Sequence, residues 1–335
     1  MKSVNSCLRT FCFILAGSPV FSPGLHSEVR VENLPGSLEV SVGEQPVLRY
    51  HTAVVPPPTG VDPVYARSGF IHPLFSPSGK ILTDPFPVGH VHQHAVFSAW
   101  ARATFRHQTV DFWNQASKLG NVEHRAVLAR KKNGFTTHLQ QVSADQGPAL
   151  DEIWKVSVEE SRNPFIIDLE TEQSCATTDE VYLHPYRYGG LAFRGSKHWN
   201  SEDEDYFEGP MKILTGQGIR DREKGNHTTP RWLAVYGPVD GQTVGVVYMD
   251  HPGNFRHPQA VRIHPTMPYF VFGPVAKGSV IIRPGMAYYA RYRIITFEGE
   301  PDAETIEGWY ARWEKRKEFR ERKLTTEDSE STEGG

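Results

Sequence analysis

The sequence predicts an all-β protein, a large antiparallel β-sandwich or supersandwich with one C-terminal helix. Three observations predict this fold class. The chain holds 29 Gly and 25 Pro, and 11% of its residues are aromatic, a composition that favours strands joined by many turns. Most segments alternate apolar and polar residues with the period of a strand, and one segment near the C-terminus has helical spacing. The sequence contains neither a dinucleotide-binding glycine motif nor a phosphate loop, which argues against a nucleotide-binding α/β fold.

Short strands separated by turn signals are expected from residue 28 onward. In the first part of the chain the predicted strands are 29–34, 37–42, 45–52, 71–75, 80–82, 90–104 and 110–113. Longer, strongly alternating strands are predicted at 121–131, 135–143, 152–160 and 164–173. A loop-rich region, 182–229, follows, and the remaining strands are 232–236, 243–249, 269–272, 279–282 and 286–297. These strands are expected to form one β-sandwich domain, 28–323.

The helix is expected over residues 303–323, because Pro301 and Asp302 supply a start signal. Its apolar stripe consists of Ile306, Trp309, Tyr310 and Trp313. A stripe at this spacing predicts that the helix packs against a sheet. The polar tail, 324–335, is predicted to be disordered.

The first 27 residues resemble an export signal peptide. Lys2 and Arg9 give a basic start, residues 11–16 are apolar, and small residues follow. Cleavage would leave Cys175 as the one remaining cysteine, which fits a periplasmic or secreted bacterial protein without a disulfide framework. An ordinary N-terminus is the alternative interpretation.

Composition also limits the partners that we expect. The net charge is −3, whereas binding to nucleic acid requires a basic face. No run of about 18 apolar residues is present in the sequence, so no segment is expected to span a membrane. With nucleic acid and a membrane span not expected, the partner that we expect is a carbohydrate or another small-molecule substrate.

The stretch 69–100 is the strongest functional signal, because it holds four of the fifteen histidines. His90, His92 and His94 are two residues apart, so on an extended strand their side chains point to one face. Three imidazoles are an unusual filling for an apolar core, which indicates that this face lines a site. Alternate residues on a strand are roughly 6–7 Å apart, so two of these histidines could converge on one ion, and three could do so only if the strand bends.

Three interpretations of these histidines are open. They act as acids and bases without a metal, they hold a divalent metal, or they form a hydrogen-bonded structural network. The sequence specifies no cofactor, and if a metal is present, His92 and His94 are the expected ligands. A third ligand would come from His72, Glu123, His124 or His251.

Glu123 and His124 are candidate partners of the histidine strand, since a carboxylate that orients an imidazole is a common device in acid–base sites. On a strand their side chains point to opposite faces, so one of the two is expected to point to the site. A surface salt bridge is the alternative for this segment. The predicted catalytic residues are therefore His92, His94, Glu123 and His124, and His72 and His90 are predicted to bind substrate.

A second polar segment directly follows the predicted strand 243–249. It supplies four further candidate substrate-binding residues, Asp250, His251, Asn254 and Arg256. An arginine fork in this segment would suit the carboxylate of a uronate or a sulfate. The alternative is a turn fixed by its Pro, Gly and Asn residues.

The long loop region contributes the last candidates. Arg194 and Trp199 are predicted to bind substrate, and Trp199 is expected to contact a sugar face. Phe193 is expected to anchor the loop. Trp100 and Trp113 are expected to lie in the core.

Several motifs occur in an order that resembles one bacterial family. They are Gly-Phe-Ile-His-Pro (69–73), Pro-Ser-Gly (77–79), His-Gln-His (92–94), Ala-Trp (99–100), Phe-Trp-Asn (112–114), Val-Glu-His (122–124), Asp-His-Pro-Gly-Asn (250–254) and Arg-His-Pro (256–258). The family is the PmoA-like group, also labelled methane oxygenase PmoA, and the resemblance covers about residues 30–315. Family members often have Gly after the His-Gln-His motif, where this chain has Ala95.

The family name implies a methane oxygenase subunit, but that enzyme subunit is a multi-helix membrane protein, whereas this sequence lacks a spanning segment and has an all-β pattern. The genomic neighbourhood of the family implies a role in carbohydrate breakdown in exported bacterial systems. The predicted architecture also resembles sugar-binding supersandwiches such as the galactose mutarotase group.

Together these observations favour an exported carbohydrate-active protein. We expect an enzyme of the glycoside hydrolase, lyase or epimerase type, which acts on a sugar or glycoside by acid–base chemistry of histidine and carboxylate groups. One alternative is a carbohydrate-binding protein without catalysis. Another is a metal-dependent oxidoreductase, as the family name implies.

Overall fold

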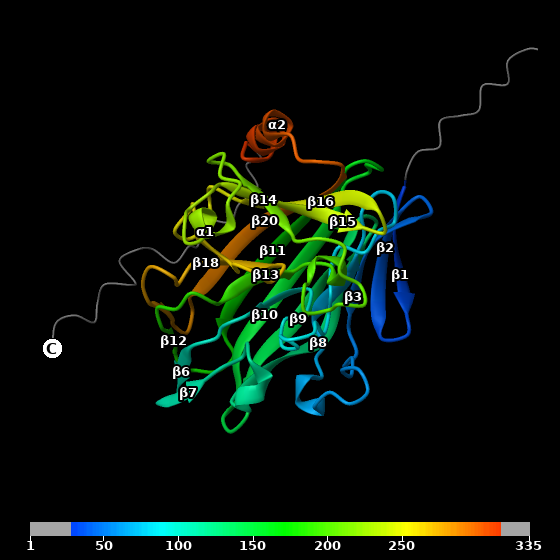
Figure 1. Cartoon of the computed structure of the whole chain (residues 1–335). Helices are drawn as coiled ribbons and strands as arrows, with labels where there is room; N and C mark the ends of the chain where they lie inside the picture. The colour runs from blue at the N-terminus through cyan, green and yellow to red at the C-terminus, as the bar shows by residue number, and fades with distance from the viewer. Residues whose placement is uncertain (1–27, 316–335) are drawn as a thin grey trace, which may run out of the picture.

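The computed structural model of the protein describes residues 28–315. Antiparallel strands form three sheets, and a short helix near the C-terminal end of the described chain covers one side (Figure 1). The predicted all-β fold class is therefore confirmed. The predicted signal peptide and polar tail lie outside the described residues. None of the helices in the described part has the length and apolar character needed to cross a membrane.

The first sheet has eight strands in the order β1-β2-β3-β4-β5-β13-β18-β17. Their bounds are β1 Val29–Leu34, β2 Ser37–Val42, β3 Gln45–His51, β4 Phe70–Leu74, β5 Val96–Ala99, β13 Gly190–Arg194, β18 Tyr269–Gly273 and β17 Ala260–Ile263. Sheet formation therefore brings strands from both halves of the sequence together, with β5 next to β13 and β13 next to β18.

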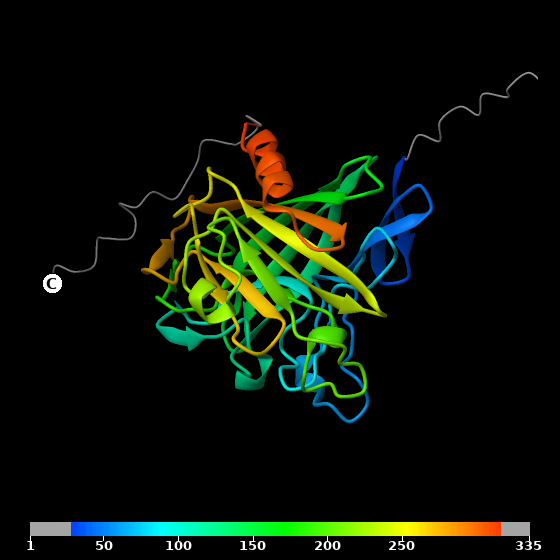
Figure 2. The ribbon, with the colours of Figure 1, turned by 45° about the horizontal axis from the view of Figure 1, so that its top comes forward.

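The second sheet also has eight strands, in the order β14-β15-β16-β20-β11-β10-β9-β8. Their bounds are β14 Lys212–Thr215, β15 Trp232–Val239, β16 Gln242–Asp250, β20 Ala287–Glu298, β11 Phe165–Cys175, β10 Gly147–Val158, β9 Gly134–Ser143 and β8 Gly120–Lys131. The long green and orange-brown strands of this sheet cross the molecule in Figure 2. Alternation of buried and half-buried residues along most of β9, β10 and β11 shows that one face of these strands is covered.

A third, smaller sheet has the order β19-β12-β6-β7. Its bounds are β19 Val280–Ile282, β12 Val181–Leu183, β6 Ala103–Phe105 and β7 Gln108–Val110. The helices are α1 Arg222–Gly225 and α2 Ala303–Trp313, and the 3-10 turns are η1 Pro63–Tyr65, η2 Gln115–Ser117 and η3 Lys197–Trp199.

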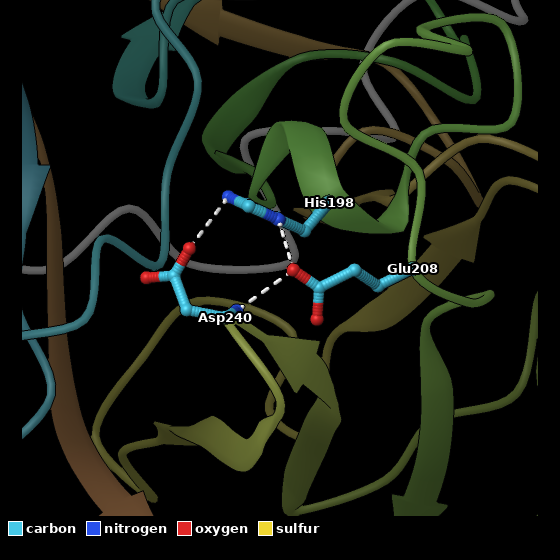
Figure 3. Close-up of side chains that lie close together, drawn as sticks. All are labelled: His198, Glu208 and Asp240. Atoms are coloured by element: carbon cyan, nitrogen blue, oxygen red, sulfur yellow. Dashed lines mark hydrogen bonds and ion pairs between the residues drawn. The ribbon is translucent and has the colours of Figure 1, made fainter.

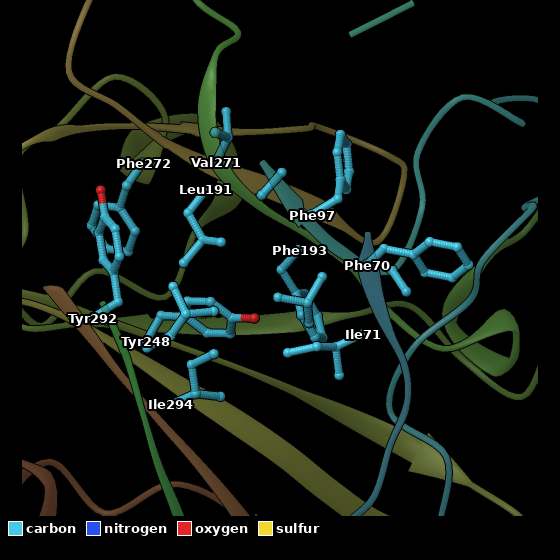
Figure 4. Packing of buried hydrophobic residues seen from close by; sticks show 14 of the residues in the cluster. Phe70, Ile71, Phe97, Leu191, Phe193, Tyr248, Val271, Phe272, Tyr292 and Ile294 are labelled. Atoms are coloured by element: carbon cyan, nitrogen blue, oxygen red, sulfur yellow. The ribbon is translucent and has the colours of Figure 1, made fainter. Parts of the chain in front are cut away.

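The main core lies between the two large sheets. Phe193 of β13 and Phe270 of β18 are paired in register, and their rings lie 5.6 and 5.0 Å from the ring of Tyr248 on β16. Figure 4 shows Phe193 pointing toward the second sheet, whereas Phe97 and Val271 point the opposite way. We call the side of the first sheet that faces away from the second sheet its outer face. Because side chains alternate along a strand, residues next to the core positions belong to this outer face.

Helix α2 packs as its apolar stripe predicts. The side chain of Asp302 accepts a hydrogen bond from the backbone N–H of Thr305 over 2.8 Å, which caps the first turn. Ile306, Tyr310 and Trp313 are buried against a second apolar cluster formed with β15, β16 and β20. The helix ends at Trp313 and a turn follows, so the predicted length is wrong for 314–315, while 316–323 lie outside the described residues.

The segment 90–95 is not a strand, contrary to the prediction. His90, Val91 and His92 lie in a turn, and β5 begins only at Val96. Ala95 has a φ of 57°, a left-handed conformation that interrupts an extended chain. Glycine would adopt this φ without strain, whereas alanine rarely does. We call residues 87–95 the histidine loop.

Other predicted bounds also need correction. Residues 80–82 form only an isolated bridge between Phe75 and Ile81, and residues 96–104 divide between β5 and β6, which belong to different sheets. The loop-rich region contains three strands that were not predicted, β12, β13 and β14, and β17 was missed as well. Short buried strands such as β13 show no alternation, because both of their faces are covered.

Candidate functional site

The outer face of the first sheet carries a buried polar layer. Arg194 in β13 pairs in register with Tyr269 in β18, so their side chains lie next to each other. Arg262 in β17 pairs with Val271, which places its side chain on the same face. Arg194 and Tyr269 are 0% exposed and Arg262 is 9% exposed. Two guanidinium groups and a phenol therefore lie where a sheet would ordinarily carry apolar side chains.

Three histidines lie above this layer. The rings of His90 and His92 are 5.8 Å apart, and the ring of His90 is 5.6 Å from that of His264, which follows β17. All three are partly exposed. Arg194 donates to Gln93, the residue after His92, and contacts the sulfur of Met267, whose backbone N–H donates to His264. The buried layer and the histidines therefore belong to one site. We call this set the outer-face cluster; it consists of His90, His92, Arg194, Arg262, His264 and Tyr269.

The imidazoles of the cluster are held in the neutral form. Burial lowers the pKa of His92 to about 4, and His90 and Arg194 add to the effect. Burial, followed by the charge of Arg262, lowers the pKa of His264 to about 4. Burial and then Arg194 also lower the pKa of His90. A neutral imidazole has one donor and one acceptor nitrogen, so it can accept a proton or bind a hydroxyl group from either side.

The loop after β17 holds His264 in one tautomer. The backbone N–H groups of Met267 and Thr266 donate to Nδ1 of His264 over 3.0 and 3.3 Å. Nδ1 is therefore the acceptor, and Nε2 carries the proton of the neutral ring. Arg222 of α1 fixes this loop, because its Nη2 donates to the carbonyl of His264 over 2.5 Å and to that of Met267.

His92 differs from its neighbours in being unconstrained. It makes no hydrogen bond to the described part of the chain, and its ring is partly exposed. His90, in contrast, has a buried Nδ1 that lacks a partner within residues 28–315. The imidazole of His92 is thus the one in the cluster whose two nitrogens are both open to a ligand.

A carboxyl group adjoins the cluster at Asp84. Its backbone N–H donates to the carbonyl of Arg194 over 3.3 Å, and burial raises its pKa to about 6 against the opposing charge of Arg194. Burial in turn lowers the pKa of Arg194 to about 10, with Asp84 and Glu202 opposing the change. A carboxyl with this pKa is available to exchange protons at mildly acidic pH.

Aromatic side chains border the cluster on the side of Tyr269. The ring of Tyr269 lies 6.1 Å from that of Trp113 and 5.9 Å from that of Tyr188. The guanidinium of Arg262 lies 5.7 Å from the centre of the Tyr188 ring. Tyr188 is partly exposed, while Trp113 and Trp100 are buried, as the sequence predicted for both tryptophans.

His94 does not join the other two histidines. It is 0% exposed, and both ring nitrogens are hydrogen-bonded: Nδ1 to the carbonyl of Pro85 over 3.0 Å, and Nε2 to the side-chain amide of Gln115 over 2.8 Å. Burial keeps its pKa well below the usual range. The expectation of one shared strand face is wrong here, and His94 matches the structural-network alternative.

Glu123 and His124 lie on β8, and neither contacts the cluster. Glu123 forms a surface ion pair with Arg125 over 2.9 Å, as the alternative interpretation stated. Nδ1 of His124 is hydrogen-bonded to the hydroxyl of Tyr50 over 3.0 Å. Burial lowers the pKa of His124 to about 4. The predicted convergence of His92 and His94 on this pair is therefore absent from the contacts of the described residues.

The polar segment after β16 forms a network of its own. The buried carboxylate of Asp250 accepts hydrogen bonds from Asn254 Nδ2, His257 Nδ1 and the backbone N–H of Gln259, over 2.7, 2.9 and 2.8 Å. The ring of His251 lies 5.0 Å from that of Trp313 in α2. These contacts tie the turn to the second sheet and to α2. The segment therefore matches the alternative interpretation, in which its residues fix a turn.

Arg256 and Trp199 are also used within the fold. Arg256 donates to three backbone carbonyls, those of Pro274, Gly278 and Ser279, over 2.7–3.0 Å. Trp199 is 0% exposed, and its Nε1 donates to the carbonyl of Pro238 over 2.8 Å. The expected sugar contact of Trp199 is wrong for this structure, because no face of the ring reaches solvent.

His72 lies on β4, also on the outer face but nearer to β3. Its Nδ1 is hydrogen-bonded to the hydroxyl of Thr83 over 3.0 Å, and its carbonyl accepts from Nε2 of His51 over 2.7 Å. Burial lowers the pKa of His72 to about 3. Of the predicted site residues, the structure thus brings together His90, His92 and Arg194.

One group of side chains in the described residues has the spacing of a metal site, and it lies elsewhere (Figure 3). Nδ1 of His198 is 2.7 Å from Glu208, Nε2 is 3.7 Å from Asp240, and the backbone N–H groups of Asp240 and Gly241 also donate to Glu208. The candidate ligand atoms already satisfy one another, and they link the loop after η3 to the hairpin of β15 and β16. His92 and His94 do not form such a group.

Sequence reasoning missed Arg262, His264, Tyr269 and Asp84. A signal for two of them is present in the sequence Ala-Val-Arg-Ile-His (260–264), where a charged residue interrupts an apolar run and a histidine follows. Tyr269 and Asp84 have no comparable signal, because their position depends on the pairing of β13 with β18 and on the path of the histidine loop.

The fold and the cluster define an all-β protein with a polar site on the outer face of its first sheet. The chain matches DUF6807, described as a family of unknown function, over residues 37–311. It therefore belongs to this family. The description of this family names no activity. The resemblance to the PmoA-like group remains a prediction from the sequence. No curated protein matches the chain.

Comparison with solved structures gives only distant likenesses. Heparan sulfate lyase HepC from Pedobacter heparinus has a TM-score of 0.37 at 10% identity, with 82% of this chain and 35% of that chain covered. The GH36 α-galactosidase AgaA from Geobacillus stearothermophilus has a TM-score of 0.34 at 8% identity, with 82% and 41% covered. This chain thus spans well under half of each.

Proposed function

We propose that the protein binds a carbohydrate, or a small molecule with similar hydroxyl groups, at the outer-face cluster and acts on it through histidine acid–base chemistry. The observation that carries this proposal is the presence of three adjacent neutral imidazoles over a buried guanidinium. Neutral imidazoles pair with hydroxyl groups as donor and as acceptor. A few convergent polar groups beside aromatic rings are the usual composition of a small-molecule site.

The roles follow from the state of each ring. His92 is the base, because its ring is neutral, partly exposed and free of hydrogen bonds to the described chain. His264 carries its proton on Nε2 and is the donor. A base beside a hydrogen-bond donor fits abstraction of a proton from a sugar, as in elimination or epimerisation. Tyr188, which is partly exposed, borders the site with aromatic surface.

A screen of glycosides and free sugars with the full chain tests this proposal. Removal of a general base costs roughly 10²–10⁴-fold in rate, so His92→Ala should lose turnover by at least about a hundredfold. His184→Ala is the matched control, because His184 bonds to Thr104 near the third sheet and should leave turnover unchanged. Sugar binding without turnover would establish the non-catalytic alternative. Turnover that survives His92→Ala would overturn the assignment of the base.

A further inference from the structure

Arg194 has an open hydrogen-bonding edge. Its Nη1 donates to the side-chain oxygen of Gln93 over 2.9 Å and contacts the sulfur of Met267 at 3.4 Å. Its Nε and Nη2 are buried and have no partner within the described chain. Arg194 also forms no ion pair with a carboxylate of the described residues, although Asp84 and Glu202 act on it from a greater distance. A buried charged N–H group without a hydrogen-bond acceptor costs free energy of folding. We therefore infer that a bound ligand supplies the acceptor.

The chemistry of that acceptor can be read from the other arginines of this protein. Arg293 donates from Nε and Nη2 to the two oxygens of Asp168 over 2.8 and 2.7 Å. Arg49 uses the same two nitrogens for Glu39, over 3.1 and 2.6 Å. In both cases the Nε–Nη2 edge binds a carboxylate, through both oxygens for Arg293 and through one oxygen for Arg49. This edge is the one that Arg194 leaves open, and its geometry matches a planar oxyanion.

The surroundings of Arg194 also favour an anion. Burial, and then the guanidinium groups of Arg262, Arg222 and Arg194 among its neighbours, lower the pKa of His264. The buried Nδ1 of His90 adds a further polar atom without a partner. The edge itself is covered in the present conformation, and Met267, whose thioether touches the guanidinium, is a flexible side chain able to turn aside.

We propose that the Nε–Nη2 edge of Arg194 receives the carboxylate of the ligand, and that the carbohydrate acted on is therefore an acidic sugar such as a uronic acid. This inference rests on the proposed function, since it concerns the same site. It replaces the sequence expectation that Arg256 supplies the fork, because Arg256 is occupied by backbone carbonyls.

Glu202 offers a variant with the opposite effect. Its exposed side chain lies against the backbone of Gly89 in the histidine loop, where a Cβ atom would come within 1.7 Å of its carboxylate. Its charge acts on both Arg194 and His90. A bound carboxylate would be repelled by it, so Glu202→Gln should strengthen the binding of acidic ligands and leave that of neutral ligands unchanged.

The test is calorimetric binding of matched pairs, glucuronate with glucose and galacturonate with galactose, and of inorganic sulfate. A charged hydrogen-bonded contact should make one uronate bind about tenfold to a hundredfold more tightly than its neutral partner. Arg194→Lys keeps the charge but removes the fork, so it should abolish this preference. Glu202→Gln should increase the preference, and this variant decides the matter if Arg194→Lys does not fold.

Equal binding of acidic and neutral sugars by the unaltered protein would overturn the inference while the proposed function stands. A preference that persists in Arg194→Lys, or one that Glu202→Gln does not change, would overturn it as well. Binding of sulfate that depends on Arg194, without binding of any sugar, would support the anion site and reject a carbohydrate ligand. Absence of binding by sugars and by sulfate would reject both.

Discussion

Replacing His94 by alanine is expected to destabilise the protein far more than the same change at His92. The ring of His94 is fully buried among Phe70, Phe86 and Phe97, with centroid distances of 5.8, 5.2 and 6.0 Å. Truncation of a buried aromatic side chain to alanine costs about 3–5 kcal/mol. His92 makes no hydrogen bond to the described chain and lies in a loop, so its truncation should cost about 1 kcal/mol or less.

Two further losses follow from the hydrogen bonds of His94. Its removal leaves the amide of Gln115 and the carbonyl of Pro85 without their partner, and a buried unsatisfied group costs about 1–3 kcal/mol. The terms overlap, so we expect a total loss of at least about 4 kcal/mol, a large part of the 5–15 kcal/mol that is usual for a folded domain.

Urea unfolding of both variants measures the difference. The midpoint for His94→Ala should fall sharply, or the variant should not fold, whereas the midpoint for His92→Ala should stay close to that of the unaltered protein with an unchanged slope. An equal midpoint for both variants would refute the assignment of His94 to the structural network.

Three other predictions concern stability and pH. The fold lowers the pKa of His72 from 6.5 to about 3, so it favours the neutral ring. The contribution of this ring to stability should be complete above pH 6.5 and decline as the pH falls toward 3, with about 2 kcal/mol lost at pH 5. The loss is measurable as a lower unfolding midpoint at pH 5, and His72→Gln should make the drop in midpoint smaller. If His92 is the base, kcat/KM should decline only as the pH approaches about 4, and a limb near 6.5 in a pH–rate profile would contradict that role. Trp199→Ala should lower the melting temperature as a core truncation and leave the ligand affinity of the folded fraction intact, which a titration of that fraction would check.

Much of the strand pattern could be predicted from local signals. The strands 29–34 and 37–42 agree with β1 and β2 because the turn at Pro35 and Gly36 separates two short alternating segments, and Gly36 has the positive φ of 72° that the turn requires. The long strands β9, β10 and β11 were found because one face is covered and the sequence therefore alternates.

The candidate site could be predicted only in part, because it depends on long-range pairing. Arg194 and Tyr269 become neighbours through the register of β13 and β18, which are separated by more than seventy residues of sequence. The spacing of His90, His92 and His94 suggested a common face, but Ala95 in the left-handed region turns the chain before β5. As a result, His94 enters the core while His90 and His92 remain at the surface.

The central claim is that the ligand binds at the outer-face cluster, and the most direct test is to follow the imidazole nitrogen signals by NMR during a titration with glucuronate or galacturonate. The signals of His90, His92 and His264 should shift with the ligand concentration. The signals of His124 and His251, on β8 and in the turn after β16, should stay in place. Shifts confined to His124 and His251 would contradict the account and place the site on the other sheet.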